Sequence, residues 1–302
     1  MEQNTALRIS DDTLVEDEAM TAEDFIRRLD AIHELPTLST VVMKLSQLLV
    51  DINISAKDVA EVIQYDQAIV TKMLKMVNSA FFGFSNKVSS VQHALMLLGF
   101  NTVRNAIIAI EVINAMNTKN KIKGFDIAAF WQHAIGVAVI SRHLDEETGH
   151  HFRENVFTAG IIHDIGKIVM AHYFGGRYQA ALETMYREKI NYWDAENRHF
   201  PMNHADVGMQ LAKRWHLPET MCNVIGRHHE TSRAGSVDDL VQIVHAADAL
   251  FHVYLEDHPS TEDWPIGSGA RRLLRPQIKS AGQWIPALND EIKEAYKLLM
   301  GE

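Results

Sequence analysis

The chain has 302 residues, of which 47% are hydrophobic and 23% are charged, so it can build a sizeable core and is not expected to be disordered throughout. Its formal net charge of -10 argues against general nucleic-acid binding, which needs a basic surface. No apolar run reaches the roughly 18 residues of a membrane span. The acidic N-terminus lacks an apolar signal core, and the single cysteine, Cys222, has no partner for an internal disulfide. We therefore expect a cytoplasmic, reduced protein.

The N-terminal part of the chain begins with an acidic stretch and continues with helix signals. Residues 1–20 are predicted to form a flexible acidic tail. Thr21 with Asp24, and Ser55 with Asp58, each form a capping box in front of an apolar-periodic run. These two patterns predict two helix starts.

Further helix signals lie in the C-terminal half. Ser236 with Asp239 forms a third capping box and opens the run DLVQIVHAADALF. Pro218 suits the first turn of a helix that runs through TMCNVIGRHHE. No segment shows sustained alternation of apolar and polar residues with β-branched enrichment, so the predicted fold class is all-α.

The polar, basic segment NTKNKIKGF, residues 117–125, divides the helical chain like a linker or long loop. We expect one domain over residues 21–255, with an N-terminal helical part at 21–118 and a second part at 124–255. The remainder, 256–302, is predicted to be a C-terminal loop and helix.

Two loops are also predicted from composition. The segment FFGFSN reads as a loop in the N-terminal part. The segment from His258 to Trp284 is rich in Pro, Gly and Ser, and we expect it to lead into a final amphipathic helix, NDEIKEAYKLLM.

The strongest functional signal is an ordered set of histidines and aspartates in the second part. Each member lies within or at the end of an apolar helical run, where an unpaired polar group is costly. Any one of these histidines taken alone is more often a core or surface residue than a metal ligand, but metal ions would explain the whole set. The set comprises His133, His163, Asp164, His204, His228, His229 and Asp248.

The segment FTAGIIHDIGKIVMAHYF has almost no polar face, so it is predicted to be one buried helix. Asp164 in its middle would be strongly destabilising unless it is paired or bound to metal. Lys167 places a cation one turn from His163, and taken alone Asp164 could simply pair with it. Gly166 leaves space beside this candidate site.

Two other members have neighbours that could share their role. Asp248 lies in the apolar run VHAADALF. His245, three residues earlier, could be a ligand in place of Asp248, or could hydrogen-bond to a ligand and orient it. His133 lies on the same helical face as apolar residues in FWQHAIGVAVI. His228 and His229 fall near a predicted helix C-terminus, where the helix dipole favours a cation.

The motif HDIGK, with a histidine about thirty residues before it and an aspartate well after it, resembles the HD superfamily of metal-dependent phosphohydrolases. His204, His228 and His229 resemble the extended set of the HD-GYP cyclic-di-GMP phosphodiesterases. This resemblance implies one ion among His133, His163, Asp164 and Asp248. It implies a second among Asp164, His204, His228 and His229, with Asp164 bridging the two ions.

The upstream half resembles HDOD domains, the HD-related output domains of bacterial signalling proteins. The resemblance lies in LPTLSTVVMKLSQLL, AEVIQYDQAIVTKMLKMVNSAFFGF and SSVQHALMLLGFNTVRN, and it covers about residues 24–255. It implies an HD-superfamily helical bundle with an N-terminal helical HDOD subdomain. Unlike many HDOD domains, this chain retains the ligand set. The segment after Glu230 lacks the GYP signature, and Ala129 stands where some HD-GYP members have a glutamate.

Together these features predict a bacterial signal-transduction protein that hydrolyses a nucleotide-type phosphoester with two divalent transition-metal ions. Imidazole and carboxylate ligands without thiolate favour iron or manganese. Lys167 and Asp164 are the expected catalytic residues, and Arg227 is a weaker candidate for contacting phosphate. The expected ligand is a phosphate-containing small molecule, such as a cyclic nucleotide or dinucleotide. The alternative is a catalytically silent output module that acts through protein–protein interaction with a signalling partner. Its interaction surface would be the FFGF loop and the helical N-terminal half, although aromatic residues of this kind more often pack in the core.

Overall fold

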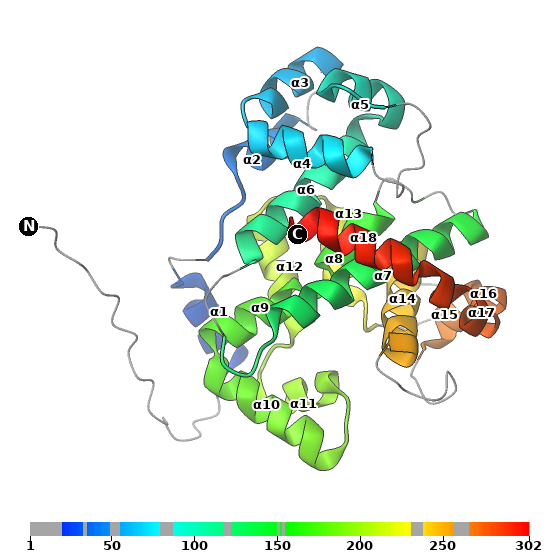
Figure 1. Ribbon diagram of the computed structural model, residues 1–302. Coiled ribbons are helices and arrows are strands. Elements are labelled where there is room, and N and C mark those ends of the chain that lie inside the picture. Colours follow the sequence, from blue (N-terminus) through cyan, green and yellow to red (C-terminus); the bar gives the residue numbers. More distant parts are fainter. Residues whose placement is uncertain are drawn as a thin grey trace, which may run out of the picture.

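The computed structural model describes residues 20–32, 35–48, 55–78, 87–117, 122–149, 152, 155–230, 238–255 and 266–301. These residues form helices joined by short turns (Figure 1), and across the described ranges the only β-type pairing is an isolated bridge between Ile122 and Phe125. The predicted all-α class is confirmed. No helix in the described part of the chain is both long and apolar enough to cross a membrane.

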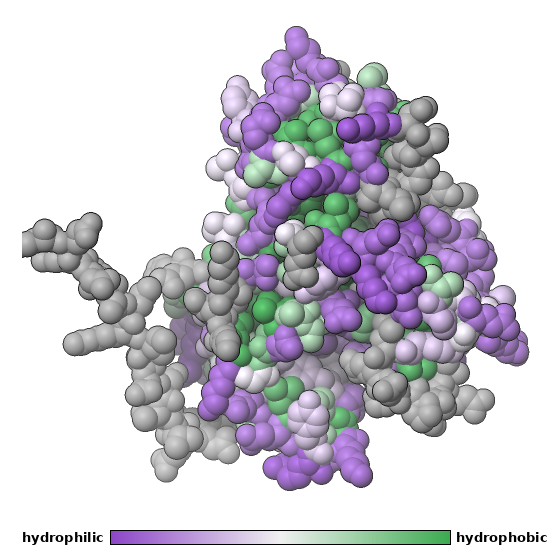
Figure 2. All heavy atoms as spheres, in the orientation of Figure 1, coloured by the Kyte–Doolittle hydropathy of each residue, from purple (hydrophilic) through white to green (hydrophobic). Residues whose placement is uncertain are grey.

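The described residues of the N-terminal half form six helices, of which α2 to α5 gather at the top of Figure 1. The capping boxes at Thr21 and Ser55 are both present, so two predicted helix starts are confirmed. Gly99, with φ of +80°, separates α5 from α6. On the face shown in Figure 2, hydrophobic residues are visible among the hydrophilic residues of this half of the chain. The helices are α1 (Ala22–Asp30), α2 (Thr40–Leu48), α3 (Ala56–Gln64), α4 (Gln67–Val77), α5 (Val91–Leu98) and α6 (Phe100–Met116).

The second half is built around one long helix, α7, which packs against α8, α14 and α18. Pro218 stands one residue before α13, at its N-cap, and not within the first turn as predicted. The helices of this half are α7 (Ile127–Thr148), α8 (Val156–Ile162), α9 (Ile165–Tyr173), α10 (Gly175–Glu188), α11 (Tyr192–His199), α12 (His204–Arg214), α13 (Glu219–Arg227) and α14 (Asp239–Leu255).

The predicted single helix through HDIGK is broken at the His-Asp pair. Helix α8 ends before His163, and α9 begins after Asp164, whose φ and ψ are -103° and 8°. The two helices pack against different neighbours, α8 against α7 and α9 against α12. A Cβ on Gly160 would lie 2.5 Å from the Cα of Ala138 on α7, whereas a Cβ on Gly166 would lie 1.9 Å from the carbonyl oxygen of His204 on α12. The prediction of one continuous helix was therefore wrong.

The C-terminal segment is more helical than its composition predicted. The described part of the expected loop folds as α15 (Ser268–Leu273), α16 (Arg275–Lys279) and α17 (Ala281–Trp284), followed by a 3-10 turn and α18 (Asn289–Met300). The short helices bury Ala270, Leu274, Ile278 and Ala281, whose spacing of three to four residues is typical of a helical face. The predicted final helix is confirmed as α18.

Several predictions concern residues outside the described ranges. They are the acidic tail over 1–19, the FFGFSN loop, the first residue of the third capping box, Ser236, and part of the linker at 117–125.

Candidate metal centre

The structure brings all seven predicted residues together in the second half of the chain. His133 comes from α7, His163 and Asp164 from the break between α8 and α9, and His204 from the first position of α12. His228 and His229 follow α13, and Asp248 comes from α14. Among the residues that the structure describes, two His/Asp groups are spaced closely enough to hold a metal ion. One contains His133, His163 and Asp248, and the other contains Asp164, His204, His228 and His229.

The first group surrounds the carboxylate of Asp248. Its Oδ1 lies 3.3 Å from Nε2 of His133 and 3.9 Å from Nε2 of His163. The same two nitrogens lie 3.5 and 3.4 Å from Oδ2 of Asp164. The side chain of His163 is fully buried, and that of His133 is 11% exposed.

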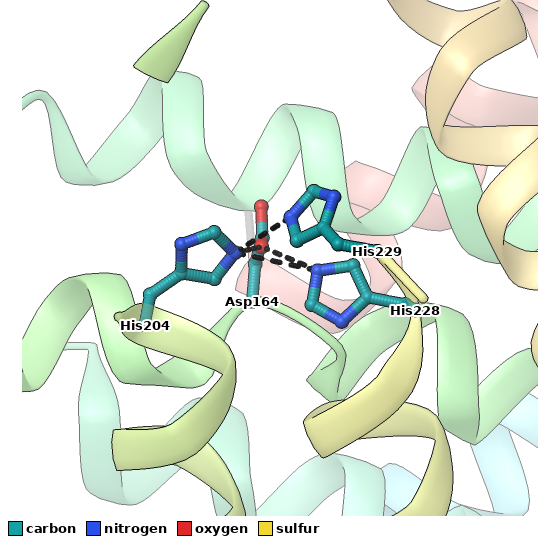
Figure 3. Close-up of side chains that lie close together, drawn as sticks. All are labelled: Asp164, His204, His228 and His229. Carbon is teal, nitrogen blue, oxygen red and sulfur yellow. Dashed lines mark hydrogen bonds and ion pairs between the residues drawn. The ribbon is translucent and has the colours of Figure 1, made fainter. Parts of the chain in front are cut away.

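In the second group, the imidazoles of His204, His228 and His229 lie close together beside the carboxylate of Asp164 (Figure 3). Oδ1 of Asp164 lies 3.1 Å from Nε2 of His204 and 3.5 Å from Nε2 of His228. Nε2 of His204 lies 3.3 Å from Nε2 of His228 and 3.0 Å from Nε2 of His229. Asp164 thus presents one carboxylate oxygen to each group.

The outer nitrogens of three rings are held by other groups of the protein. Nδ1 of His163 donates to the carbonyl oxygen of Gly160 at 2.8 Å, and Nδ1 of His228 donates to that of Ile225 at 2.9 Å. Nδ1 of His204 contacts Oε2 of Glu196 at 2.5 Å. A proton held on Nδ1 leaves Nε2 of a neutral imidazole with its lone pair turned into the site, which is the arrangement found in histidines that bind metal.

The atoms that face the centre of the site are better suited to binding a cation than to forming hydrogen bonds with one another. Nε2 of His163, Oδ1 of Asp164 and Oδ1 of Asp248 are buried and have no hydrogen-bond partner among the described residues. Nε2 of His204 and Nε2 of His228 lie 3.3 Å apart, and two neutral rings with their protons on Nδ1 would turn their lone pairs toward each other there unless a proton or a metal ion lay between them. Buried nitrogen and oxygen donors of this kind suit a divalent transition metal. The residues present therefore fit a metal site.

The electrostatics favour the ligating forms of most of these groups. Burial lowers the pKa of His163 to about 3 and holds the pKa of His229 well below its usual value. Burial acts to raise the pKa values of Asp164 and Asp248, but neighbouring histidines, and Lys167 beside Asp164, lower both of them well below the usual range. Neutral imidazoles and ionised carboxylates are the forms that bind metal.

His204 differs from the other histidines. Burial acts to lower its pKa, but Glu196 and Asp164 together outweigh burial and raise the pKa of His204 to about 9. Without an ion, this ring therefore holds an additional proton, which metal binding would release.

Lys167 lies at the edge of the first group. Its Nζ contacts Oδ2 of Asp164 at 2.5 Å and lies 5.7 Å from the ring centroid of Tyr192. Its side chain is 19% exposed, so solvent reaches part of it. The simple pairing of Asp164 with Lys167 is therefore present in the structure. Arg227, the weaker candidate, pairs with Glu230 at 3.0 Å.

Other side chains that touch the site were not predicted from the sequence, among them His252, Trp193 and Glu196. Nε2 of His252 lies 3.3 Å from Oδ1 of Asp248, four residues earlier on α14. Trp193 packs against His229 with ring centroids 4.4 Å apart, and Glu196 holds His204. His245 faces away, because its Nε2 accepts a hydrogen bond from the backbone N–H of Gly267 at 3.0 Å. The spacing of four from Asp248 was the available signal for His252.

The all-helical fold around a buried His-Asp pair is HD-superfamily-like, and it has relatives among solved structures. An HDOD domain protein with unknown function from Geobacter sulfurreducens is 26% identical, with a TM-score of 0.71, and the match covers 91% of this chain and 96% of that one. A protein from Shewanella amazonensis SB2B named "Putative phosphohydrolase" shares the fold, with 21% identity, a TM-score of 0.69, and coverage of 90% and 97%.

The family follows from the sequence match. A model of the HDOD domain matches residues 35–231, and the chain belongs to the HDOD domain family. An uncharacterized protein of Treponema pallidum (strain Nichols) is 23% identical over 209 residues. That match covers 68% of this chain but only 39% of the relative, so the chain corresponds to well under half of that protein.

Proposed function

We propose that this protein is a metal-dependent phosphohydrolase of the phosphodiesterase type with a dinuclear site. The observation that supports it most is the position of Asp164 between the two groups, with Oδ2 toward His133 and His163 and Oδ1 toward His204 and His228. A carboxylate in this position can bridge two ions. The fold shared with the "Putative phosphohydrolase" of Shewanella amazonensis SB2B agrees with this reaction class.

The seven residues are proposed to hold two divalent ions, of which iron and manganese suit the imidazole and carboxylate donors best. Two ions bound there would supply Lewis-acid stabilisation of charge at a phosphoester. Asp164 would hold both ions, one through each carboxylate oxygen. Lys167, which is partly exposed beside Asp164, is proposed to move its ammonium group onto a non-bridging phosphoryl oxygen of the substrate.

The proposed substrate is a phosphate-containing small molecule of the nucleotide type, such as a cyclic nucleotide or dinucleotide. The net charge of -10 makes a long nucleic acid a poor substrate, and the bound cations would provide local positive charge for a small anion. The HDOD resemblance further suggests a role in bacterial signal transduction in the cytoplasm.

The test is hydrolysis by wild-type protein loaded with Fe²⁺ or Mn²⁺. The substrates are bis-p-nitrophenyl phosphate, cyclic mononucleotides and cyclic dinucleotides. Asp164→Asn should abolish turnover, whereas His172→Ala, which changes an exposed histidine on α9, should leave it unchanged. Metal-loaded wild type that is inert on every substrate would contradict the hydrolase proposal and favour the regulatory module that acts through a protein partner.

A further inference from the structure

We propose that Glu196 is a positioning residue for the second group, and that its buried negative charge strengthens the binding of one ion through His204. This inference rests on the proposed dinuclear site. It concerns a residue on α11 that lies outside the seven predicted ligands.

The geometry places Glu196 directly behind a proposed ligand. Its side chain is fully buried, and Oε2 contacts Nδ1 of His204 at 2.5 Å. The same oxygen accepts a hydrogen bond from the backbone N–H of His204 at 3.3 Å. A carboxylate can only accept, so Nδ1 donates, and Nε2 of His204 is the nitrogen that faces Asp164, His228 and His229. Glu196 thereby fixes both the orientation of the ring and the nitrogen that is offered to an ion.

The two groups differ in the charge of their own ligands. The first contains the carboxylate of Asp248 in addition to one oxygen of Asp164, whereas the second contains three imidazoles and the other oxygen of Asp164. A divalent ion in the second group would therefore meet less negative charge from its ligands. Glu196 supplies a carboxylate on the opposite side of the His204 ring from the proposed ion. A carboxylate that is hydrogen-bonded to a metal-bound histidine makes that histidine a stronger metal ligand.

A purely structural role for Glu196 is the competing explanation. Glu196 accepts the N–H of the first residue of α12, where the helix dipole favours an anion. Asp206 stabilises the same helix end in a different way: it forms a capping box with Asn203, in which its carboxylate accepts from the backbone N–H of Asn203 rather than from the ring of His204. Removing Asp206 therefore disturbs the start of α12 without removing the charge behind His204.

The experiment compares Glu196→Gln with wild type by titration of the metal-free protein with Mn²⁺, with the bound metal counted by elemental analysis. Glutamine keeps the volume and an acceptor oxygen but loses the charge. We expect the first ion to bind as in wild type, and the affinity for the second ion to fall by roughly tenfold to a hundredfold, the usual cost of losing such a partner. Asp206→Ala should lower the melting temperature of the metal-free protein and leave both affinities unchanged. Asp194→Asn, which removes an exposed charge from α11, should change neither affinity.

The outcomes separate this inference from the proposed function. If wild type binds two ions and Glu196→Gln binds both with unchanged affinity, or loses both equally, the role assigned to Glu196 is wrong and the dinuclear site stands. An equal loss of second-ion affinity in Asp206→Ala would show that the start of α12 matters and not the charge of Glu196. If wild type itself does not bind two ions, the dinuclear site fails, and this inference fails with it.

Discussion

Gly166 and His204 are in backbone contact across the site: a Cβ built on Gly166 would lie 1.9 Å from the carbonyl oxygen of His204. The same Cβ would lie 2.8 Å from the backbone nitrogen of Gly208, one turn further along α12. Gly166 follows Asp164 by two residues, and His204 is the first residue of α12. The absence of a side chain at position 166 therefore allows α9 to approach α12 closely enough for the 3.1 Å distance between Asp164 and His204.

Gly166→Ala should consequently destabilise the fold and move Asp164 away from His204 within the second group. The methyl group meets backbone atoms that cannot rotate away, so we expect a loss of about 1–3 kcal/mol, the usual range for overpacking. Denaturant unfolding of the metal-free protein measures this loss. Gly176→Ala is the matched control, because nothing lies within 4 Å of its Cβ position. Equal stability of Gly166→Ala and wild type would show that the contact is easily relieved.

The bridging position of Asp164 leads to a prediction about ion stoichiometry. Asp164→Ala should bind neither ion, because each group loses the carboxylate oxygen that Asp164 presents to it. His204→Ala should retain one ion, because the first group contains His133, His163 and Asp248 without it. Elemental analysis after reconstitution with iron or manganese gives the count. An equal loss of metal in both variants would contradict independent sites, or would show that the two ions bind only as a pair.

Removal of metal should lower the melting temperature. The site buries inward-facing atoms that have no hydrogen-bond partner among the described residues, such as Nε2 of His163 and Oδ1 of Asp248, so an ion stabilises the native state in particular. At a free metal concentration about a hundred times Kd, one site contributes about 2.7 kcal/mol. In a protein of this size that amounts to several degrees in Tm. Thermal unfolding with and without chelator measures the difference, and the absence of a difference at saturating metal would count against a metal site in the folded protein.

The sequence predicted best those features that depend on local chemistry. The capping boxes at Thr21 and Ser55 require only residues three apart, and both are present. The seven polar residues were predicted to come together because unpaired polar groups are costly in their apolar surroundings, and because their order resembles the ligand sets of the HD superfamily. The substrate and the ions themselves are not determined by that order.

The features that depend on packing between distant segments could not be predicted. The helix break at His163 and Asp164 arises because α8 packs on α7 and α9 packs on α12, and no proline in the local run marks it. Glu196 lies in the polar segment YWDAENRH, where a glutamate is expected to be exposed, yet its side chain is fully buried beside His204. The apolar spacing in the C-terminal segment was obscured by its Pro, Gly and Ser content, so three short helices there were predicted as loop.

The last prediction concerns Lys167. It tests whether this cation binds substrate or only pairs with Asp164. Its ammonium group contacts Oδ2 of Asp164, the oxygen that faces the first group. Burial acts to lower the pKa of Lys167, but Asp164 and Asp248 outweigh it and raise that pKa, so the group is charged at neutral pH.

Lys167→Ala should retain both ions, because no proposed ligand is removed and a competing cation is lost. Turnover of a phosphodiester should fall by roughly tenfold to a hundredfold, because a charge-assisted contact is worth about 1.5–3 kcal/mol. Lys213→Ala, an exposed change on α12, should leave turnover unchanged. If Lys167→Ala turns over as fast as wild type, Lys167 has no role toward the substrate although the hydrolase stands, whereas loss of the ions would show that Lys167 serves mainly to hold Asp164 in place.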